Sequence, residues 1–154
     1  FGGIDPDTGT SLGTRTILAE NFITYQLPGG EQSPPFAEYT SGHSTFSSAG
    51  AAVLQAFTGS DNLDAHIIVP PQTSAFDAAL PGDVYQFQWD TFSEAAIDGG
   101  ASRIYGGIHF SDGNVDGLSA GATIGADAYD LATEFANGTA QPEQQPFFDE
   151  FFIA

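Results

Sequence analysis

Apolar residues recur at helical spacing after the turn Ser41-Gly42-His43, and this pattern predicts a helix from about residue 44 to residue 57. Residues at i, i+3, i+4 and i+7 share one side of a helix, so this side is expected to face the interior. The predicted inner face consists of Phe46, Ala49, Gly50, Val53, Leu54 and Phe57.

Two further helices are predicted downstream. One starts near Thr91, with Thr91 or Ser93 as its cap and Glu94 in its first turn, and is expected to stop or restart at Gly99-Gly100. The other runs from about residue 114 to residue 135, with an apolar face of Leu118, Ile124, Ala128, Leu131 and Phe135. The predicted fold class is therefore all-α, a partial helical bundle with long irregular loops.

The last predicted helix carries a glycine stripe, formed by Gly117, Gly121 and Gly125. Each glycine costs about 1 kcal/mol relative to alanine in a helix interior. A close approach of another helix backbone would offset that cost, because only glycine leaves room for it. The stripe thus predicts a tight helix–helix contact.

The remaining segments divide the chain into three parts. Residues 1–40 are punctuated by Gly and Pro and form an irregular N-terminal arm, within which residues 16–25 have the spacing of a short helix. Residues 41–137 form the helical core, interrupted by a long connection over residues 58–90. Residues 138–154 form a tail that is expected to fold back or to dock on another chain, because it holds Phe147, Phe148, Phe151 and Phe152.

The charge of the chain excludes several partners. Its only basic residues are Arg15 and Arg103, there are twenty acidic residues, and the formal net charge is −18. No nucleic acid partner and no anionic membrane surface are expected, because both require many Lys or Arg side chains. The absence of cysteine removes disulfides and thiolate chemistry. An acidic protein without lysine suits an extracellular or periplasmic location, and a chain that opens at Phe1 suits a processed product.

One set of polar residues can carry chemistry. Ser41, Gly42 and His43 stand directly before a helix, where backbone N–H groups and the helix dipole favour an anion. Arg103 and His109 lie six residues apart, on either side of a glycine joint. A guanidinium and two imidazoles in this arrangement suit an oxyanion pocket.

Two segments resemble signature motifs of the vanadium-dependent haloperoxidases. They are PPFAEYTSGHSTFSSAGAAVLQAF at residues 34–57 and SRIYGGIHFSDGNVDGLSAGATIG at residues 102–125, similar to the second and third motifs of that family. The family shares its fold and anion site with type 2 phosphatidic acid phosphatases and bacterial acid phosphatases. The resemblance implies vanadate as cofactor, and hydrogen peroxide and halide as substrates.

The resemblance also implies a role for each residue of the set. Ser41 and the Gly42 amide would hydrogen-bond vanadate oxygens, and Arg103 would bind and neutralise the equatorial oxygens. His43 would be the acid–base residue near the apical oxygen. His109 would be the protein ligand to vanadium.

The first motif of the family, a lysine followed seven positions later by Arg-Pro, is missing. The chain has no lysine, and Arg15 is preceded by Thr8 at that spacing and followed by Thr16. Three explanations stay open: another segment of a longer enzyme carries the motif, a second chain donates the cations, or the protein is a non-catalytic structural or assembly subunit. An acid phosphatase with His109 as nucleophile is a further alternative.

Two other features have simpler interpretations. His66 is expected to be a strand or loop residue. Asp112, Asn114 and Asp116 resemble part of a calcium loop, but the glutamate at its twelfth position is absent, so helix capping by Asp112 or Asn114 is expected instead.

Overall fold

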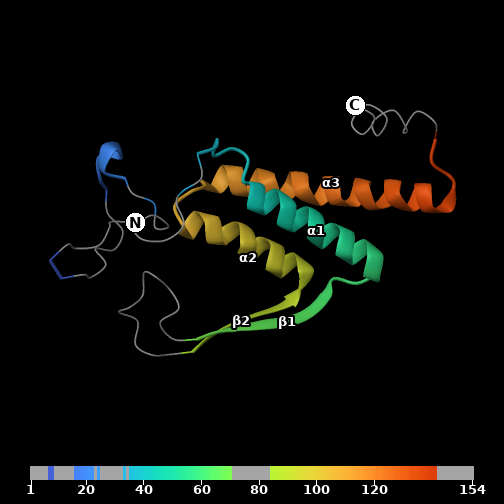
Figure 1. The fold of residues 1–154 in the computed structure, drawn as a ribbon, viewed down its shortest axis with the longest axis horizontal. Helices are drawn as coiled ribbons and strands as arrows, with labels where there is room; N and C mark the ends of the chain where they lie inside the picture. Colours follow the sequence, from blue (N-terminus) through green and yellow to red (C-terminus); the bar gives the residue numbers. More distant parts are fainter. Residues whose placement is uncertain are drawn as a thin grey trace.

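The structure is a computed structural model that describes residues 7–8, 16–22, 24, 33, 35–70 and 84–141. Over these residues it is mostly helical, with three α-helices and one antiparallel hairpin (Figure 1). The elements in chain order are a 3-10 turn at Ala19–Asn21, α1 at Gly42–Thr58, β1 at Asn62–Val69, β2 at Tyr85–Thr91, α2 at Phe92–Tyr105 and α3 at Ser111–Asn137.

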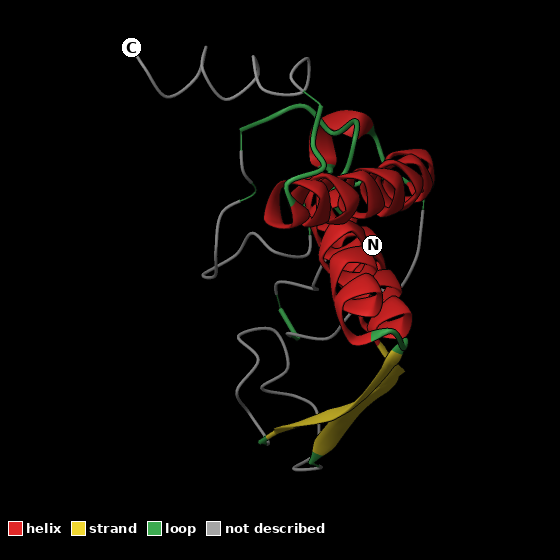
Figure 2. Cartoon of the chain, turned by 90° about the vertical axis from the view of Figure 1, so that its right-hand side faces the viewer, coloured by secondary structure: helices red, strands yellow, loops and turns green. Residues whose placement is uncertain are grey.

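Helix α1 lies between α2 and α3 (Figures 1 and 2). The hairpin follows the end of α1 and leads into the start of α2, and it lies on the side opposite α3. The glycine stripe of α3 faces α1, as predicted. A Cβ at Gly117 would lie 2.9 Å from the carbonyl oxygen of Ser41, and one at Gly125 would lie 2.8 Å from the Cα of Ala49. Ser48 adds a hydrogen bond across the same contact, donating to the carbonyl of Leu118 at 2.6 Å.

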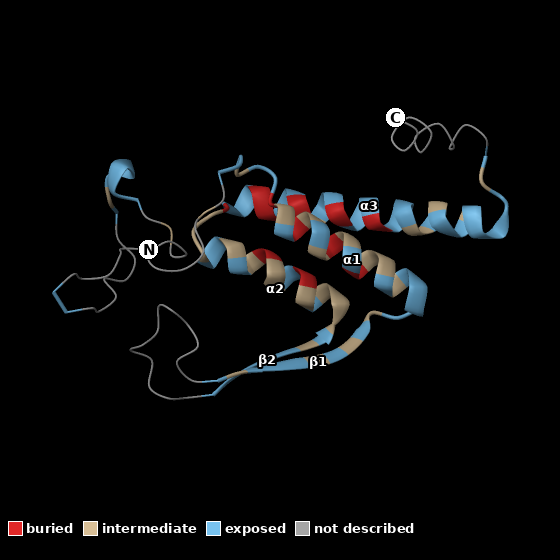
Figure 3. Ribbon diagram, viewed as in Figure 1, coloured by how far each residue is buried: buried red, intermediate tan, exposed pale blue. Residues whose placement is uncertain are grey.

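The face that α1 buries differs from the predicted one. Its buried residues are Ser44, Ser48 and Ala51, whereas Phe46 is 81% exposed and Phe57 is 75% exposed. Figure 3 shows buried positions of α1 among intermediate and exposed ones. The backbone of α3 approaches so closely at the glycine stripe that only small side chains fit between the two helices. The large apolar residues therefore lie on the outer faces of α1.

The label all-α is too strict, because residues that were predicted to form an irregular connection form a β-hairpin. Strands β1 and β2 pair antiparallel from Asn62 opposite Thr91 to Val69 opposite Tyr85, with an irregularity before Ala65. Asp61 joins the hairpin to α2, since its carbonyl accepts from Phe92 N at 3.0 Å. His66 lies on β1 and is exposed, as expected for a strand residue.

Helix α2 begins as the sequence predicts. Thr91 accepts a hydrogen bond from Glu94 N at 3.0 Å, and the Glu94 carboxylate accepts one from Thr91 N at 3.2 Å, which completes a capping box. The helix does not stop at Gly99-Gly100 but continues to Tyr105. A Cβ at Gly100 would lie 2.9 Å from the Ser44 hydroxyl oxygen, so this glycine serves close packing and does not end the helix.

Parts of the remaining predictions lie outside the described residues. Residues 142–154, which include all four tail phenylalanines, are outside the description, as is most of the N-terminal arm. Within residues 16–25, the described helical structure is limited to the 3-10 turn at Ala19–Asn21. Among the described helices, none is both long enough and apolar enough to cross a membrane.

Candidate oxyanion site

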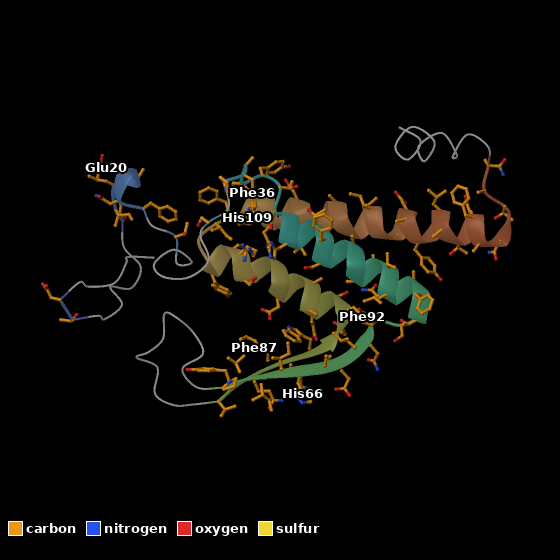
Figure 4. All side chains as sticks on the ribbon, viewed as in Figure 1. Glu20, Phe36, His66, Phe87, Phe92 and His109 are labelled. Carbon is orange, nitrogen blue, oxygen red and sulfur yellow. The ribbon has the colours of Figure 1, made fainter. Side chains whose placement is uncertain are left out.

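The start of α1, the end of α2 and the start of α3 meet at one end of the molecule. Ser41 N donates to the carbonyl of Gly113 at 3.0 Å, which joins the start of α1 to the first turn of α3. Residues 106–110 connect α2 directly to α3, and His109 and Phe36 lie together at this end, away from the hairpin (Figure 4). The segments that carry the predicted site residues therefore converge.

His109 is the most constrained residue of the site, with a side chain that is 0% exposed. Its Nδ1 lies 2.7 Å from the carbonyl oxygen of Glu38. A carbonyl can only accept, so Nδ1 carries the proton of this hydrogen bond. In the neutral ring Nε2 then holds a lone pair, and this buried atom has no hydrogen-bond partner among the described residues. The hydrogen bond leaves Nε2 available to a ligand.

His43 and Arg103 lie close enough to interact electrostatically. His43 is exposed in the first turn of α1. Arg103 is half-buried in the last turn of α2, where its positive charge interacts favourably with the helix dipole. Partial burial lowers the pKa of His43 below its ordinary value, and the charges of Arg103 and His109 lower it further. A neutral His43 beside the Arg103 guanidinium can accept a proton, and the negative charge of an anion bound there would oppose the effect of the positive charge.

Ser41 and Gly42 occupy the helix start that the sequence indicates. Ser41 is 0% exposed, and its hydroxyl accepts from Ser44 N at 3.3 Å as the N-cap of α1. The Ser44 hydroxyl lies 2.8 Å from Ser41 Oγ and 2.6 Å from Asn114 Oδ1, which forms a buried polar cluster between α1 and α3. Gly42 is half-buried at the first helical position. Vanadate binding by Ser41 and Gly42 stays a prediction, with Ser41 already engaged in capping.

An apolar cavity of about 490 Å³ opens beside His109. The ring of Phe36 stacks on His109, with centroids 6.0 Å apart and planes inclined by 22°. The apolar residues that line the cavity are Phe22, Phe36, Ile104, Ile108 and Phe110.

Glu38 belongs to the site although the sequence motifs do not indicate it. Its contact with His109 uses the backbone carbonyl, which any residue could supply, so no sequence signal marks it. Its carboxylate accepts from Phe110 N at 2.9 Å. The prediction that Asp112 or Asn114 caps α3 is wrong: the N-cap is Phe110, which makes no side-chain capping bond.

The calcium interpretation finds no support in the described part of the chain. There, no group of three or more His, Asp or Glu side chains comes together to bind a metal ion. Asp116 instead accepts a hydrogen bond from the hydroxyl of Tyr39 at 2.8 Å. A single imidazole ligand to an oxyanion needs no such cluster.

Residues 5–138 match the family model of the VCPO second helical-bundle domain. The chain belongs to this family. The similarity of residues 34–57 and 102–125 to vanadium haloperoxidases is thereby confirmed. No curated protein sequence matches the chain.

Solved structures give the same relationship. The chain is similar to an apo-type bacterial vanadium-dependent chloroperoxidase, with 26% identity, a TM-score of 0.66, and coverage of 82% of this chain and 27% of that chain. It is also similar to a holo-type bacterial vanadium-dependent chloroperoxidase, with 27% identity, a TM-score of 0.63, and coverage of 80% and 25%. This VCPO-type domain thus spans about a quarter of the length of these chloroperoxidases.

The residues present fit one side of a vanadate site. The buried Nε2 of His109 offers a nitrogen ligand whose orientation is fixed from the opposite ring nitrogen, an arrangement typical of metal-bound histidine. Arg103 offers a positive charge for oxyanion oxygens, and the start of α1 offers backbone N–H groups. The cations of the family's first motif have no counterpart in this chain.

Proposed function

We propose that this VCPO-type domain contributes to a vanadium-dependent haloperoxidase that oxidises halide with hydrogen peroxide. The observation that carries the proposal is the buried Nε2 of His109, which faces no protein partner among the described residues while Nδ1–H is held by Glu38. Family membership and the similarity to two bacterial chloroperoxidases support it. Vanadate, when bound, supplies a Lewis-acidic centre that activates peroxide toward halide.

Each part of the candidate site has a defined role in this proposal. His109 binds vanadium through Nε2, with its ring held by the Nδ1–H hydrogen bond. Arg103 neutralises oxyanion oxygens, and the N–H groups at the start of α1 orient them. His43 accepts and returns a proton at its exposed imidazole, because the lowered pKa keeps the ring neutral near pH 7.

A charge deficit determines what else the site requires. Each missing cation removes a Coulomb attraction of about 4 kcal/mol at 4 Å with an effective dielectric constant near 20. A chain of net charge −18 should therefore hold an oxyanion weakly by itself. We infer that a further segment or a second chain supplies Lys and Arg beside His109. The exposed apolar residues on the outer faces of α1, such as Phe46 and Phe57, offer area for such a contact.

Vanadate-dependent bromination tests the proposal. The chain is assayed for bromination and for phosphate release, with and without vanadate, alone and together with the segment that carries the cationic motif. We expect vanadate-dependent bromination that the cationic segment strengthens, that His109→Ala abolishes and that His66→Ala leaves unchanged. Phosphate release that vanadate inhibits, without bromination, would instead identify the acid phosphatase.

A second candidate is a non-catalytic structural or assembly subunit. The large apolar side chains exposed on α1 favour it, because an extended exposed apolar surface is typical of a protein–protein contact. A structure of the assembly separates the two. Lys and Arg of a neighbouring segment within about 3 Å of an anion at His109 indicate the enzyme, whereas partner side chains that cover His109, in an inactive assembly, indicate the structural subunit.

A further inference from the structure

Glu38 holds two consecutive residues through two different groups. Its backbone carbonyl accepts the Nδ1–H of His109 at 2.7 Å, and its carboxylate accepts from Phe110 N at 2.9 Å. The carboxylate oxygen also lies 3.7 Å from His109 Nδ1. A single side chain thus anchors the loop that supplies the carbonyl.

The carboxylate occupies the start of α3, which has no cap of its own. Phe110 is the N-cap and makes no side-chain capping bond, and the Glu38 carboxylate accepts from its backbone N–H, the bond that the glutamate of a capping box would make. Gly113 makes room for that acceptor: a Cβ there would collide with Glu38 Oε1 and would lie 3.2 Å from its Cδ. The negative charge of the Glu38 carboxylate also interacts favourably with the dipole of α3 at its N-terminus.

We propose that Glu38 is a positioning residue whose carboxylate fixes the orientation and tautomer of His109. With the carboxylate docked on α3, the residue 38 carbonyl stays in line with Nδ1, so the proton remains on Nδ1 and the lone pair remains on Nε2. Without it, the residue 38 carbonyl can shift relative to Nδ1 even though Tyr39 and Ser41 still bind α3, and the ring can rotate or exchange its proton between the two nitrogens. The consequence for vanadate rests on the proposed function, whereas the consequence for the imidazole does not.

Nitrogen-15 NMR of the His109 ring tests the inference in the 154-residue chain. Glu38→Met removes the acceptor but keeps the length of the side chain, and Glu38→Gln keeps an acceptor oxygen. At a pH where the ring is neutral, we expect the Nδ1–H form alone in the unmodified chain and in Glu38→Gln, and a mixture of both tautomers in Glu38→Met.

The matched control is Glu94→Met. Glu94 also accepts backbone hydrogen bonds at a helix start, from Asp90 N at 2.8 Å and Thr91 N at 3.2 Å, but it belongs to α2. Its loss should leave the His109 spectrum unchanged even if it destabilises the chain equally. A similar change of tautomer in Glu94→Met would show that general loosening is the cause, and would overturn the inference.

A second variant covers the case in which Glu38→Met does not fold. Gly113→Ala places a methyl group against the carboxylate and displaces it, while alanine itself favours the helix. It should produce the same mixture of tautomers. A single Nδ1–H form in a folded Glu38→Met or Gly113→Ala protein would overturn the inference.

Binding of inorganic vanadate gives the functional readout, and its failure is distinguishable from failure of the inference. Where the chain binds vanadate, Glu38→Met should weaken binding on the order of 10- to 100-fold, as is typical for partners of metal-bound histidines, and Glu38→Gln should restore it. Absence of vanadate binding in every variant, even together with the segment that carries the cationic motif, contradicts the proposed function, while the tautomer measurement still decides the role of Glu38. Vanadate binding that Glu38→Met leaves unchanged overturns the inference and spares the function.

Discussion

Gly121→Ala should destabilise the contact between α1 and α3. A Cβ at this position would lie 2.9 Å from the carbonyl carbon of Thr45, closer still to its oxygen, and 3.0 Å from the Cβ of Ser48. Backbone atoms cannot rotate away, so we take an overpacking cost near the upper end of its usual range, about 3 kcal/mol. Alanine returns about 1 kcal/mol of helix propensity. The net loss is roughly 2 kcal/mol, or a Tm lower by roughly 4–8 °C for a chain of this size.

Gly50→Ala is the matched control for this measurement. Gly50 lies in α1 on an exposed face, and a Cβ there would meet no atom within 4 Å. The same substitution should therefore stabilise the protein by about 1 kcal/mol. Thermal and urea unfolding of both variants provide the comparison. A Gly121→Ala protein that is as stable as the unmodified chain, while Gly50→Ala is stabilised, would refute the close approach of the two helices.

Three further predictions concern the buried cluster, the cap of α2 and the histidine of α1. Ser44→Ala removes a hydroxyl 2.6 Å from buried Asn114 Oδ1 and should lower the free energy of unfolding by about 1–3 kcal/mol, measured in urea. Thr91→Ala should lower it by about 1 kcal/mol, whereas Thr123→Ala, on an exposed face of α3, should change it by less than about 0.5 kcal/mol. The lowered pKa of His43 means that the folded state binds its proton less readily than the unfolded state. The contribution of His43 to the free energy of unfolding is therefore fully present above pH 6.5, its ordinary pKa, and declines as the pH falls below that value. His43→Asn should accordingly flatten the decline of the urea midpoint in the range below pH 6.5.

Local sequence rules predicted features that depend on a few neighbouring residues. The capping box of Thr91 and Glu94 follows from hydrogen bonds within one helical turn, and the structure contains it. The glycine stripe was also interpreted correctly, because three glycines on one face need a backbone contact to offset their cost. Both rules act through the backbone and do not require knowledge of the partner helix.

Apolar periodicity failed for α1 because the partner decides which face is buried. Phe46 and Leu54 share a face typical of a helix interior, yet α1 buries Ser44, Ser48 and Ala51 against the glycines of α3. Small polar residues with hydrogen-bond partners allow the closest approach of two helices, and the sequence of α1 alone does not show that approach.

The glycines of α2 and the hairpin were missed for a related reason. Gly99-Gly100 was interpreted as a helix end, but a glycine that packs against a side chain and one that ends a helix are identical in sequence. The hairpin forms from a short apolar run around Ile67 and Ile68 in β1 and from β2, which begins at Tyr85, well beyond the end of β1 at Val69. The pairing of two strands so far apart in sequence depends on the rest of the fold, so the residues of either strand alone do not predict it.

The candidate site residues could be proposed from the sequence where chemistry depends on side chains, and their roles stay predictions. His43, Arg103 and His109 were identified from motifs, and in the structure His43 lies within electrostatic range of the other two. Glu38 was not identified, because its carbonyl has no residue-specific signature and its carboxylate caps α3 from another part of the chain.

The central claim is that His43, Arg103 and His109 lie close enough to act on one bound anion, and histidine NMR titration of Arg103→Met tests it most directly. The chain has three histidines, and His66 lies on the exposed hairpin as an internal control. We predict that loss of the guanidinium raises the pKa of His43 toward its ordinary value, since the charge of Arg103 lowers it, while the His66 resonances stay the same in both proteins. An identical His43 titration with and without Arg103, in a folded protein, would contradict this arrangement.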